Sequence, residues 1–299
     1  MTVRKSSYLT DSNQDAPRRA LLRYFGGKWA LAPWVLAHLP PHRIYCEPFG
    51  GAASVLLRKP RSRIEVYNDL DDEIVSLFRV VQDPASCREL MRRLRRTPYA
   101  RREFERAFQH STDPIIRAQR AITRAYQSFH HEALFNLKKT TFADARHRTS
   151  NHCKAHEWST YPRGLAAICR RMQGVVIECR DALDVIRAQD TRDTLFFVDP
   201  PYLPSTRSKS GYRHEMDEAA HAALLTSLRK VKGMVVLAGY PSDLYDRTLH
   251  DWTRLEHHHY AAGSQRQRTE VLWLSKNSTR HLHPTPKRAV ATPPRLRAS

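Results

Sequence analysis

The run Asp199-Pro200-Pro201-Tyr202 follows a short apolar segment, residues 195–198, and constrains the chain more than any other feature. An apolar, aromatic-rich run of this length is typical of a strand buried on both faces, as in a parallel sheet. Two prolines cannot continue a central strand, so the chain must turn there. The turn leaves a carboxylate and an aromatic ring at the carboxyl end of a strand, where open α/β sheets bind ligands. This pair suits a flat heterocycle that carries an amino group.

Strand patterns occur in two separate blocks of the chain. The first block predicts strands at 44–46 and 64–67 with helices at 52–57 and 72–81, which is a βαβ unit. The second block predicts strands at 175–178, 195–198, 234–238, 255–260 and 271–275. We therefore expect one α/β sheet built from residues 20–82 and 174–275, interrupted by a mainly helical, arginine-rich insert at 83–173. Two unrelated domains are the alternative, but each half-sheet would then be small and exposed at its edges.

The charge of the chain is strongly one-sided. Its 299 residues carry a net charge of +20 and the pI is about 10.2, which indicates a polyanionic partner. Residues 83–175 hold 19 Lys and Arg against 8 Asp and Glu, so this segment alone contributes +11. Nucleic acid is the favoured partner, and an anionic membrane surface is the alternative. Residues 1–19 and 276–299 are polar and basic, and we expect a flexible arm and a disordered tail.

The composition also argues against several classes of protein. No apolar run approaches the roughly 20 residues of a membrane helix, and the N-terminus lacks the apolar core of a signal peptide. The five cysteines are scattered and odd in number, which favours reduced thiols in a cytoplasmic protein. No metal is expected, because the one suggestive group has no strong zinc spacing: His147, His152, Cys153 and His156.

Three further motifs precede the helical insert. Phe25-Gly26-Gly27-Lys28 combines glycines that allow close backbone approach with a cation for a carboxylate, although an ordinary helix-initiating turn would look the same. The turn at 47–54 is rich in small residues and lets a cofactor lie against backbone amides, but it lacks the dinucleotide pattern G-x-G-x-x-G. Asp69 and Asp181 each follow a predicted strand. Either acid suits a ribose hydroxyl or a helix N-cap, and for Asp181 the two interpretations are equally weighted.

Taken together and in this order, these motifs resemble the Dam-type (alpha-group) N6-adenine DNA methyltransferases over roughly residues 20–275. The stretch 268–273 is similar to the closing strand of that family. The resemblance implies a Rossmann-like methyltransferase sheet that uses S-adenosylmethionine and releases S-adenosylhomocysteine, with an inserted DNA-recognition domain. By the same resemblance, the residues that would contact the cofactor are Tyr24, Gly26, Gly27, Lys28, Glu47, Phe49, Gly50, Gly51, Asp69, Asp181 and Asp199.

The resemblance places the chemistry on Asp199, Pro200, Pro201 and Tyr202. The adenine N6 lone pair is delocalised into the ring, and the Asp199 carboxylate and Pro200 carbonyl would accept both of its N–H bonds. The base must leave the duplex to be reached, and Tyr202 would stack on it. An N4-cytosine or RNA methyltransferase and a catalytically dead DNA-binding protein are the alternatives. The recognition sequence, and whether a restriction nuclease is a partner in a bacterial or phage-infected cell, stay open.

Overall fold

A seven-stranded sheet forms the centre of the described part of this chain. The structure is a computed structural model that describes residues 16–24, 26–129, 141–144, 153–206, 212–260 and 267–280. The strands are β1 (Ile44–Glu47), β2 (Ile64–Asn68), β3 (Val176–Glu178), β4 (Thr194–Val198), β5 (Met234–Gly239), β6 (Thr253–Tyr260) and β7 (Gln267–Leu274). All seven strand positions expected from the sequence are confirmed, with boundary shifts that are largest at β7, which begins four residues early.

The strand order is β3-β2-β1-β4-β5-β7-β6. The first five strands run parallel, whereas β7 is antiparallel to β5 and β6 is antiparallel to β7. Strands from the two blocks of sequence pair directly, because Ile44 of β1 stands opposite Thr194 of β4 and Val66 of β2 stands opposite Val176 of β3. The two blocks therefore share one sheet, which excludes two unrelated domains.

The helices are α1 (Ala32–Ala37), α2 (Ser54–Arg58), α3 (Asp72–Gln82), α4 (Pro84–Arg96), α5 (Arg101–Arg106), α6 (Pro114–Gln127), α7 (Lys154–Met172), α8 (Ala182–Gln189), α9 (Glu218–Leu228), α10 (Asp243–Thr248) and α11 (Lys276–Thr279). Several of them begin at an aspartate that accepts a backbone N–H. Asp83 and Asp113 cap α4 and α6 directly before a proline at the first helical position. This is a sequence-local start signal, because proline lacks the N–H that a helix cannot use there.

The two faces of the sheet have separate hydrophobic cores. Alternation along β4 sends Leu195 and Phe197 to one face and Phe196 and Val198 to the other. The cluster on the first face includes α1, α2 and α3 and continues into α4, α6 and α7, and the cluster on the second face includes α8, α9 and α10. Helices on both faces of a mostly parallel sheet make a doubly wound α/β arrangement. The mixed α/β fold is therefore confirmed and agrees with a Rossmann-like methyltransferase sheet.

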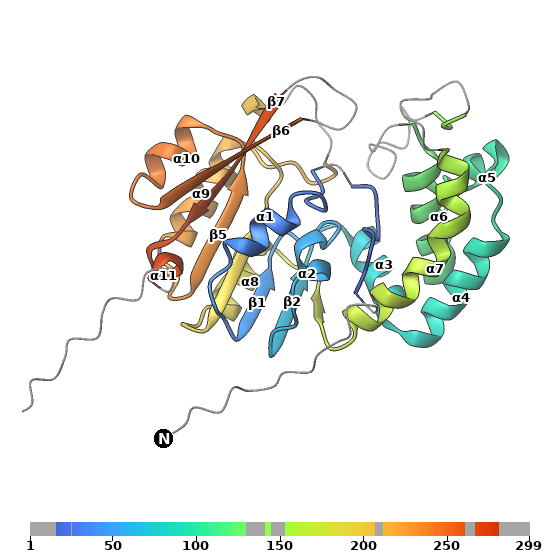
Figure 1. Cartoon of the computed structure of the whole chain (residues 1–299), viewed down its shortest axis with the longest axis horizontal. Helices are drawn as coiled ribbons and strands as arrows, with labels where there is room; N and C mark the ends of the chain where they lie inside the picture. Colours follow the sequence, from blue (N-terminus) through green and yellow to red (C-terminus); the bar gives the residue numbers. More distant parts are fainter. Residues whose placement is uncertain are drawn as a thin grey trace, which may run out of the picture.

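Helices α4–α7 gather beyond the β3 edge, at the opposite end from β6 and β7 (Figure 1). Leu90 of α4, Ile122 of α6 and Leu165 of α7 join the same buried cluster as Phe78 of α3. The Trp158 indole N–H of α7 donates to the Thr97 carbonyl at 2.7 Å and ties α7 to the end of α4. The helical segment is thus packed onto the sheet through α3.

Both ends of the described part contact the rest of the fold, and the flexible arm and disordered tail stay predictions. Arg19, placed in the expected arm, lies over the Tyr161 ring at 5.5 Å. Residues 276–279, placed in the expected tail, form α11, which Ser275 caps and in which Ser278 is buried. Residues 1–15 and 281–299 lie outside the described part. Within the described residues, no helix is long and apolar enough to cross a membrane.

Candidate active site

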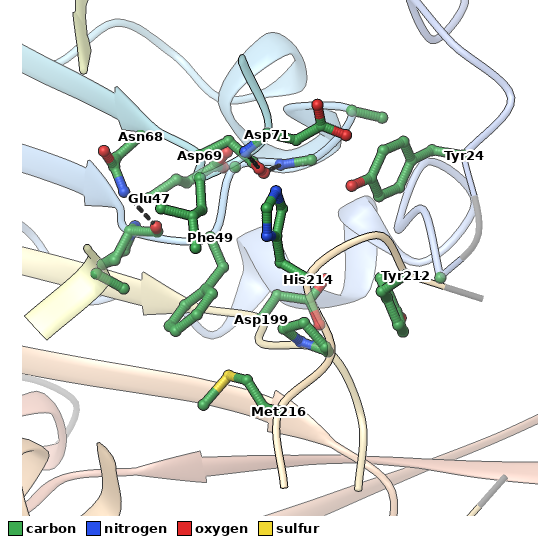
Figure 2. Close-up of a pocket in the computed structure, with 18 of the residues that line it drawn as sticks. Tyr24, Glu47, Phe49, Asn68, Asp69, Asp71, Asp199, Tyr212, His214 and Met216 are labelled. Atoms are coloured by element: carbon green, nitrogen blue, oxygen red, sulfur yellow. Dashed lines mark hydrogen bonds between the residues drawn. The ribbon is translucent and has the colours of Figure 1, made fainter. Parts of the chain in front are cut away.

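A cavity of about 330 Å³ opens at the carboxyl ends of the parallel strands (Figure 2). The turns that follow β1, β2, β3 and β4 all contribute to it, as expected for an open α/β sheet. Most of the residues that the sequence singled out line this cavity, and it brings together Tyr24, Gly26, Gly27, Lys28, Glu47, Phe49, Gly50, Gly51, Asp69, Asp181, Asp199 and Pro201. Pro200 and Tyr202 lie behind this surface, and Phe25 lies outside the described residues.

The turn after β1 requires its glycines. A Cβ on Gly50 would stand 2.1 Å from the Tyr67 ring, and Gly51 has φ +47°. The Tyr67 hydroxyl donates to the Gly51 carbonyl at 2.7 Å. Ala53, at the start of α2, is also in the left-handed region with φ 52°. These contacts hold the backbone of the turn flat against β2, so that it forms one wall of the cavity.

The buried Glu47 side chain also stabilises this turn. Its side chain is 2 % exposed, and its Oε1 accepts from the Tyr45 hydroxyl at 2.6 Å and from the Leu56 N–H at 2.8 Å. Burial raises the pKa of Glu47 to about 7, although both hydrogen bonds act in the opposite direction. Glu47 lines the cavity and at the same time joins β1 to α2.

Asp69 stands between the turns after β1 and β2. Its Oδ2 accepts the Gly51 N–H at 2.8 Å and its Oδ1 accepts the Asp71 N–H at 2.9 Å. The N-cap of α3 is Asp71, which accepts from the Glu73 N–H. Burial raises the pKa of Asp69. Asp69 therefore reaches the cavity with both oxygens oriented by backbone amides, and another residue caps the helix.

Asp181 is the N-cap of α8 and also lines the cavity, and its contact with a ribose stays a prediction. As the cap it accepts the Leu183 N–H at 2.9 Å. Asn68, the last residue of β2, fixes the neighbouring turns because its amide donates to the carbonyls of Pro48 at 2.8 Å and Arg180 at 3.0 Å. The ends of β1, β2 and β3 are thus joined by one buried side chain.

A charged cluster lies at the end of β4. The Lys28 ammonium is 2.9 Å from Asp199 Oδ1 and 3.5 Å from Glu270 Oε1, and Lys28 is only 4 % exposed. Burial alone would lower the pKa of Lys28, but the charges of Asp199 and Glu270 outweigh burial and raise it. Burial raises the pKa of Asp199 to about 6 against the opposing effect of Lys28. Asp199 is therefore a carboxylate at neutral pH.

Tyr202 lies beneath this cluster. It is 6 % exposed, its hydroxyl donates to Glu270, and the Lys28 ammonium lies 4.7 Å from its ring centroid. The ring of Tyr240 meets it edge-on at 4.4 Å. These contacts position the Tyr202 ring next to Asp199, and stacking on a base stays a prediction.

Residues 212–216 cross the mouth of the cavity. Figure 2 shows the His214 ring extending from this segment toward Asp69. Arg213 fastens the segment, because its guanidinium bonds Asp71 Oδ1 at 2.8 Å and Glu73 Oε2 at 2.7 Å. A Cβ on Gly26, which has φ +74°, would stand 2.6 Å from the Tyr212 hydroxyl. The turn at Gly26 and the segment at 212–216 therefore lie against each other at the edge of the cavity.

Comparison with known proteins decides the family. Residues 24–259 match the model of the D12 class N6 adenine-specific DNA methyltransferases. This chain belongs to that family. The match covers β1–β5, the cavity, the helical segment and nearly all of β6, and it ends before β7. The resemblance expected from the motifs is therefore confirmed.

The methyltransferase is also similar to curated bacterial proteins. DNA adenine methylase of Escherichia coli (strain K12) is 25 % identical over 217 residues, which cover 69 % of this chain and 74 % of that protein. DNA adenine methylase of Vibrio cholerae serotype O1 is 23 % identical over 252 residues, covering 80 % and 87 %. The chain is therefore an adenine-specific DNA methyltransferase that acts at N6, and the N4-cytosine, RNA and inactive alternatives are not favoured.

Family membership implies S-adenosylmethionine as the cofactor and double-stranded DNA as the substrate. The cavity fits this cofactor in its chemistry. The Asp69 and Asp181 carboxylates are acceptors for hydroxyl and amino groups, whereas Phe49, Leu183 and Met216 supply apolar surface. Side chains on Gly50 and Gly51 would disturb the wall they form. The residues present therefore suit a nucleoside-containing ligand.

The structure offers no new reason to expect a metal. Within the residues it describes, no three His, Cys, Asp or Glu side chains come together as a metal site. Of the histidines and cysteine weighed from the sequence, Cys153 and His156 are described, whereas His147 and His152 lie outside the described part.

Sequence reasoning missed two groups of site residues. Glu270 lies in the stretch 268–273 that resembles the family's closing strand, and an acid directly before an apolar run, residues 271–274, was a second signal, but neither was taken to mark a site residue. Residues 212–216 have no distinctive local pattern. They reach the cavity because the chain returns across it before α9.

Proposed function

We propose that Asp199 and Pro200 receive the amino group of a target adenine that has left the DNA duplex. The observation that carries this assignment is the position of Asp199 at the cavity edge of β4, with one carboxylate oxygen held at 2.9 Å by Lys28. Oδ1 of Asp199 is buried, while the side chain as a whole is 17 % exposed. In this proposal Oδ2 is the oxygen that faces the ligand.

The chemical role of Asp199 follows from its charge. An ionised carboxylate and a backbone carbonyl accept the two N6 hydrogens, which favours a pyramidal nitrogen and stabilises the positive charge that develops on it. When bound, S-adenosylmethionine supplies an electrophilic methyl group. The remaining task of the protein is to hold the two reactants in line, and such positioning is worth several kcal/mol, on the order of 7–11 in favourable cases.

We assign the cofactor contacts to the walls formed by the turns after β1, β2 and β3. Asp69, oriented by the Gly51 and Asp71 amides, suits the ribose hydroxyls, and Asp181 suits a polar edge of the cofactor. Lys28 lies beside Asp199, whereas the Tyr24 ring lies next to Gly51 in the turn after β1. Lys28 pairs with Asp199 and Glu270, so its contribution to the cofactor carboxylate is secondary in this proposal.

We assign target recognition to the helical segment 83–173. Its support is the net charge of +11 over residues 83–175 and the position of α4–α7 at one end of the molecule (Figure 1). Arg92 and Arg93 both bond Glu89 on their own helix, whereas Arg95 and Arg96 are exposed at the end of α4. Exposed arginines of this kind suit contacts with phosphates, which position DNA without reading its sequence.

Single-turnover methylation by Asp199→Ala tests the assignment. We expect methyl transfer to fall by at least about 10²–10³, the scale of losing one preorganised charge-stabilising group, while DNA affinity stays near wild type. Asp193→Ala is the matched control, because Asp193 precedes the opposite end of β4 and is 58 % exposed. Near-normal turnover by Asp199→Ala would contradict the assignment.

Base extrusion needs a separate measurement. A duplex with 2-aminopurine at the methylated position should gain a long-lifetime fluorescence component with the wild-type enzyme, because the base leaves its stack. The position itself comes from sequencing DNA methylated by the enzyme, and nucleoside mass spectrometry identifies N6-methyladenine. If no unstacked population appears at saturating S-adenosylhomocysteine, extrusion is not part of the mechanism.

A further inference from the structure

Glu270 is a buried acid in the apolar strand β7. Its side chain is 3 % exposed, and the four residues after it, Val271 to Leu274, are fully buried. In the sheet it stands opposite His257 of β6. Burying a carboxylate costs several kcal/mol unless it is paired and hydrogen-bonded. Its partners should therefore explain why the strand carries it.

The partners of Glu270 are the two residues that flank Asp199. Oε1 of Glu270 accepts the Tyr202 hydroxyl and lies 3.5 Å from the Lys28 ammonium. Lys28 in turn lies 2.9 Å from Asp199, and Tyr202 follows Asp199 by three residues. One oxygen of Glu270 thus contacts two groups: the Lys28 ammonium, which pairs with Asp199, and the hydroxyl of Tyr202, at the end of the turn that Asp199 begins.

The charges of this cluster do not balance. Two carboxylates, Asp199 and Glu270, share one ammonium, that of Lys28. A different arrangement surrounds Glu65 on β2, which is equally buried but has two cations, Lys59 at 2.7 Å and Arg171 at 2.6 Å. Excess negative charge is therefore a feature of the cavity cluster that the buried acid Glu65 does not share.

We propose that Glu270 is a positioning residue for methyl transfer. Because Glu270 shares the Lys28 ammonium, the negative charge of Asp199 is only partly neutralised. Glu270 also holds the Tyr202 ring beside Asp199 through the Tyr202 hydroxyl. A carboxylate whose charge is fully compensated by an ammonium is a weaker hydrogen-bond acceptor. By sharing Lys28, Glu270 leaves charge on Asp199 for the amino group of adenine. This inference rests on the proposed role of Asp199.

Glu270→Gln separates the charge of this side chain from its shape, because glutamine keeps an oxygen for the Tyr202 hydroxyl. With the charge gone, Lys28 would neutralise Asp199 alone. The acid limb of the pH profile of kcat/KM, which reports groups of the free enzyme, should move to lower pH by about one unit or more. The plateau rate should fall about tenfold or more, with the dissociation constant for S-adenosylhomocysteine within about twofold of wild type. The other ionisable residues near the cluster are unchanged in Glu270→Gln, so the substitution alters only one charge there. They are Glu47, Tyr212, Tyr245 and His257.

Two further variants keep the test decisive. Glu270→Asp restores the charge and should return the acid limb toward the wild-type position, and it serves if Glu270→Gln does not fold. Glu65→Gln should lower the melting temperature with no movement of the limb, because its ion pairs lie outside the cavity. If the acid limb and plateau of Glu270→Gln match the wild type while only thermal stability drops, Glu270 is purely structural and the inference fails. If Asp199→Asn keeps full activity, the proposed function fails instead.

Discussion

Asp69→Asn is the sharpest test of how the cavity binds its cofactor. The Asp69 carboxylate accepts one backbone N–H on each oxygen, from Gly51 at 2.8 Å and from Asp71 at 2.9 Å. An asparagine presents one oxygen and one NH₂ group, so one of these amides would face a donor. The substitution therefore removes the charge and also disturbs the turn that the glycines form.

The expected magnitude follows from the number of bonds affected. A hydrogen bond from a ribose hydroxyl to a carboxylate is worth about 1.5–3 kcal/mol, so its loss should raise the dissociation constant roughly 10- to 150-fold. The backbone donor left without an acceptor costs about 1–3 kcal/mol of stability. Both effects should appear, because Asp69 holds the turn and faces the cavity at the same time.

Titration calorimetry with S-adenosylhomocysteine, together with thermal unfolding of the ligand-free enzyme, measures the two effects separately. Asp113→Asn is the matched control. Asp113 also accepts two backbone N–H groups, from Ile115 and Ile116, but both on Oδ1 and outside the cavity. Because asparagine keeps one carbonyl oxygen for these amides, this variant should keep most of its stability as well as its cofactor affinity. A lower melting temperature with an unchanged dissociation constant for Asp69→Asn would refute a cofactor contact and leave Asp69 as a turn residue only.

Three further predictions concern other parts of the enzyme. The kcat/KM for DNA should rise with pH through about 6, because burial raises the pKa of Asp199 to about 6 and only the ionised form accepts both N6 hydrogens; an acid limb near pH 4 would contradict this. Arg213→Ala should speed dissociation of S-adenosylhomocysteine in stopped-flow measurements by about three- to tenfold, because the ion pairs of Arg213 with Asp71 and Glu73 hold residues 212–216 over the cavity. Arg187→Ala, which removes an exposed ion pair of α8, should leave the dissociation rate unchanged. Truncation after Arg280, which keeps α11, should reduce the slope of log affinity against log salt concentration by about 0.9 for each phosphate that the tail neutralises. The methylated sequence should stay the same, and a new target site would show that the tail reads bases.

Local features of the chain were readable without the structure. The apolar run before Asp199, the glycine turn at 47–54 and the acid after β2 are local patterns, because residue composition, proline breaks and the positive φ of glycine are properties of a few consecutive residues. Parallel strands then bring their carboxyl ends to one edge. The order of the motifs was therefore sufficient to predict the sheet and the family, and most of the predicted site residues line the cavity.

Contacts between distant segments were decided only by the tertiary structure. Glu270 meets Lys28 because β7 enters the sheet beside β5, and Arg213 reaches Asp71 across 142 positions of sequence. No local pattern encodes such pairs, since the sequence near one partner does not say which distant residue will lie beside it. The sequence by itself determined which side chains stand at the carboxyl ends of the strands. The packing of the sheet determined how one buried ammonium is shared between Asp199 and Glu270, because charge balance in a buried site depends on every segment that meets there.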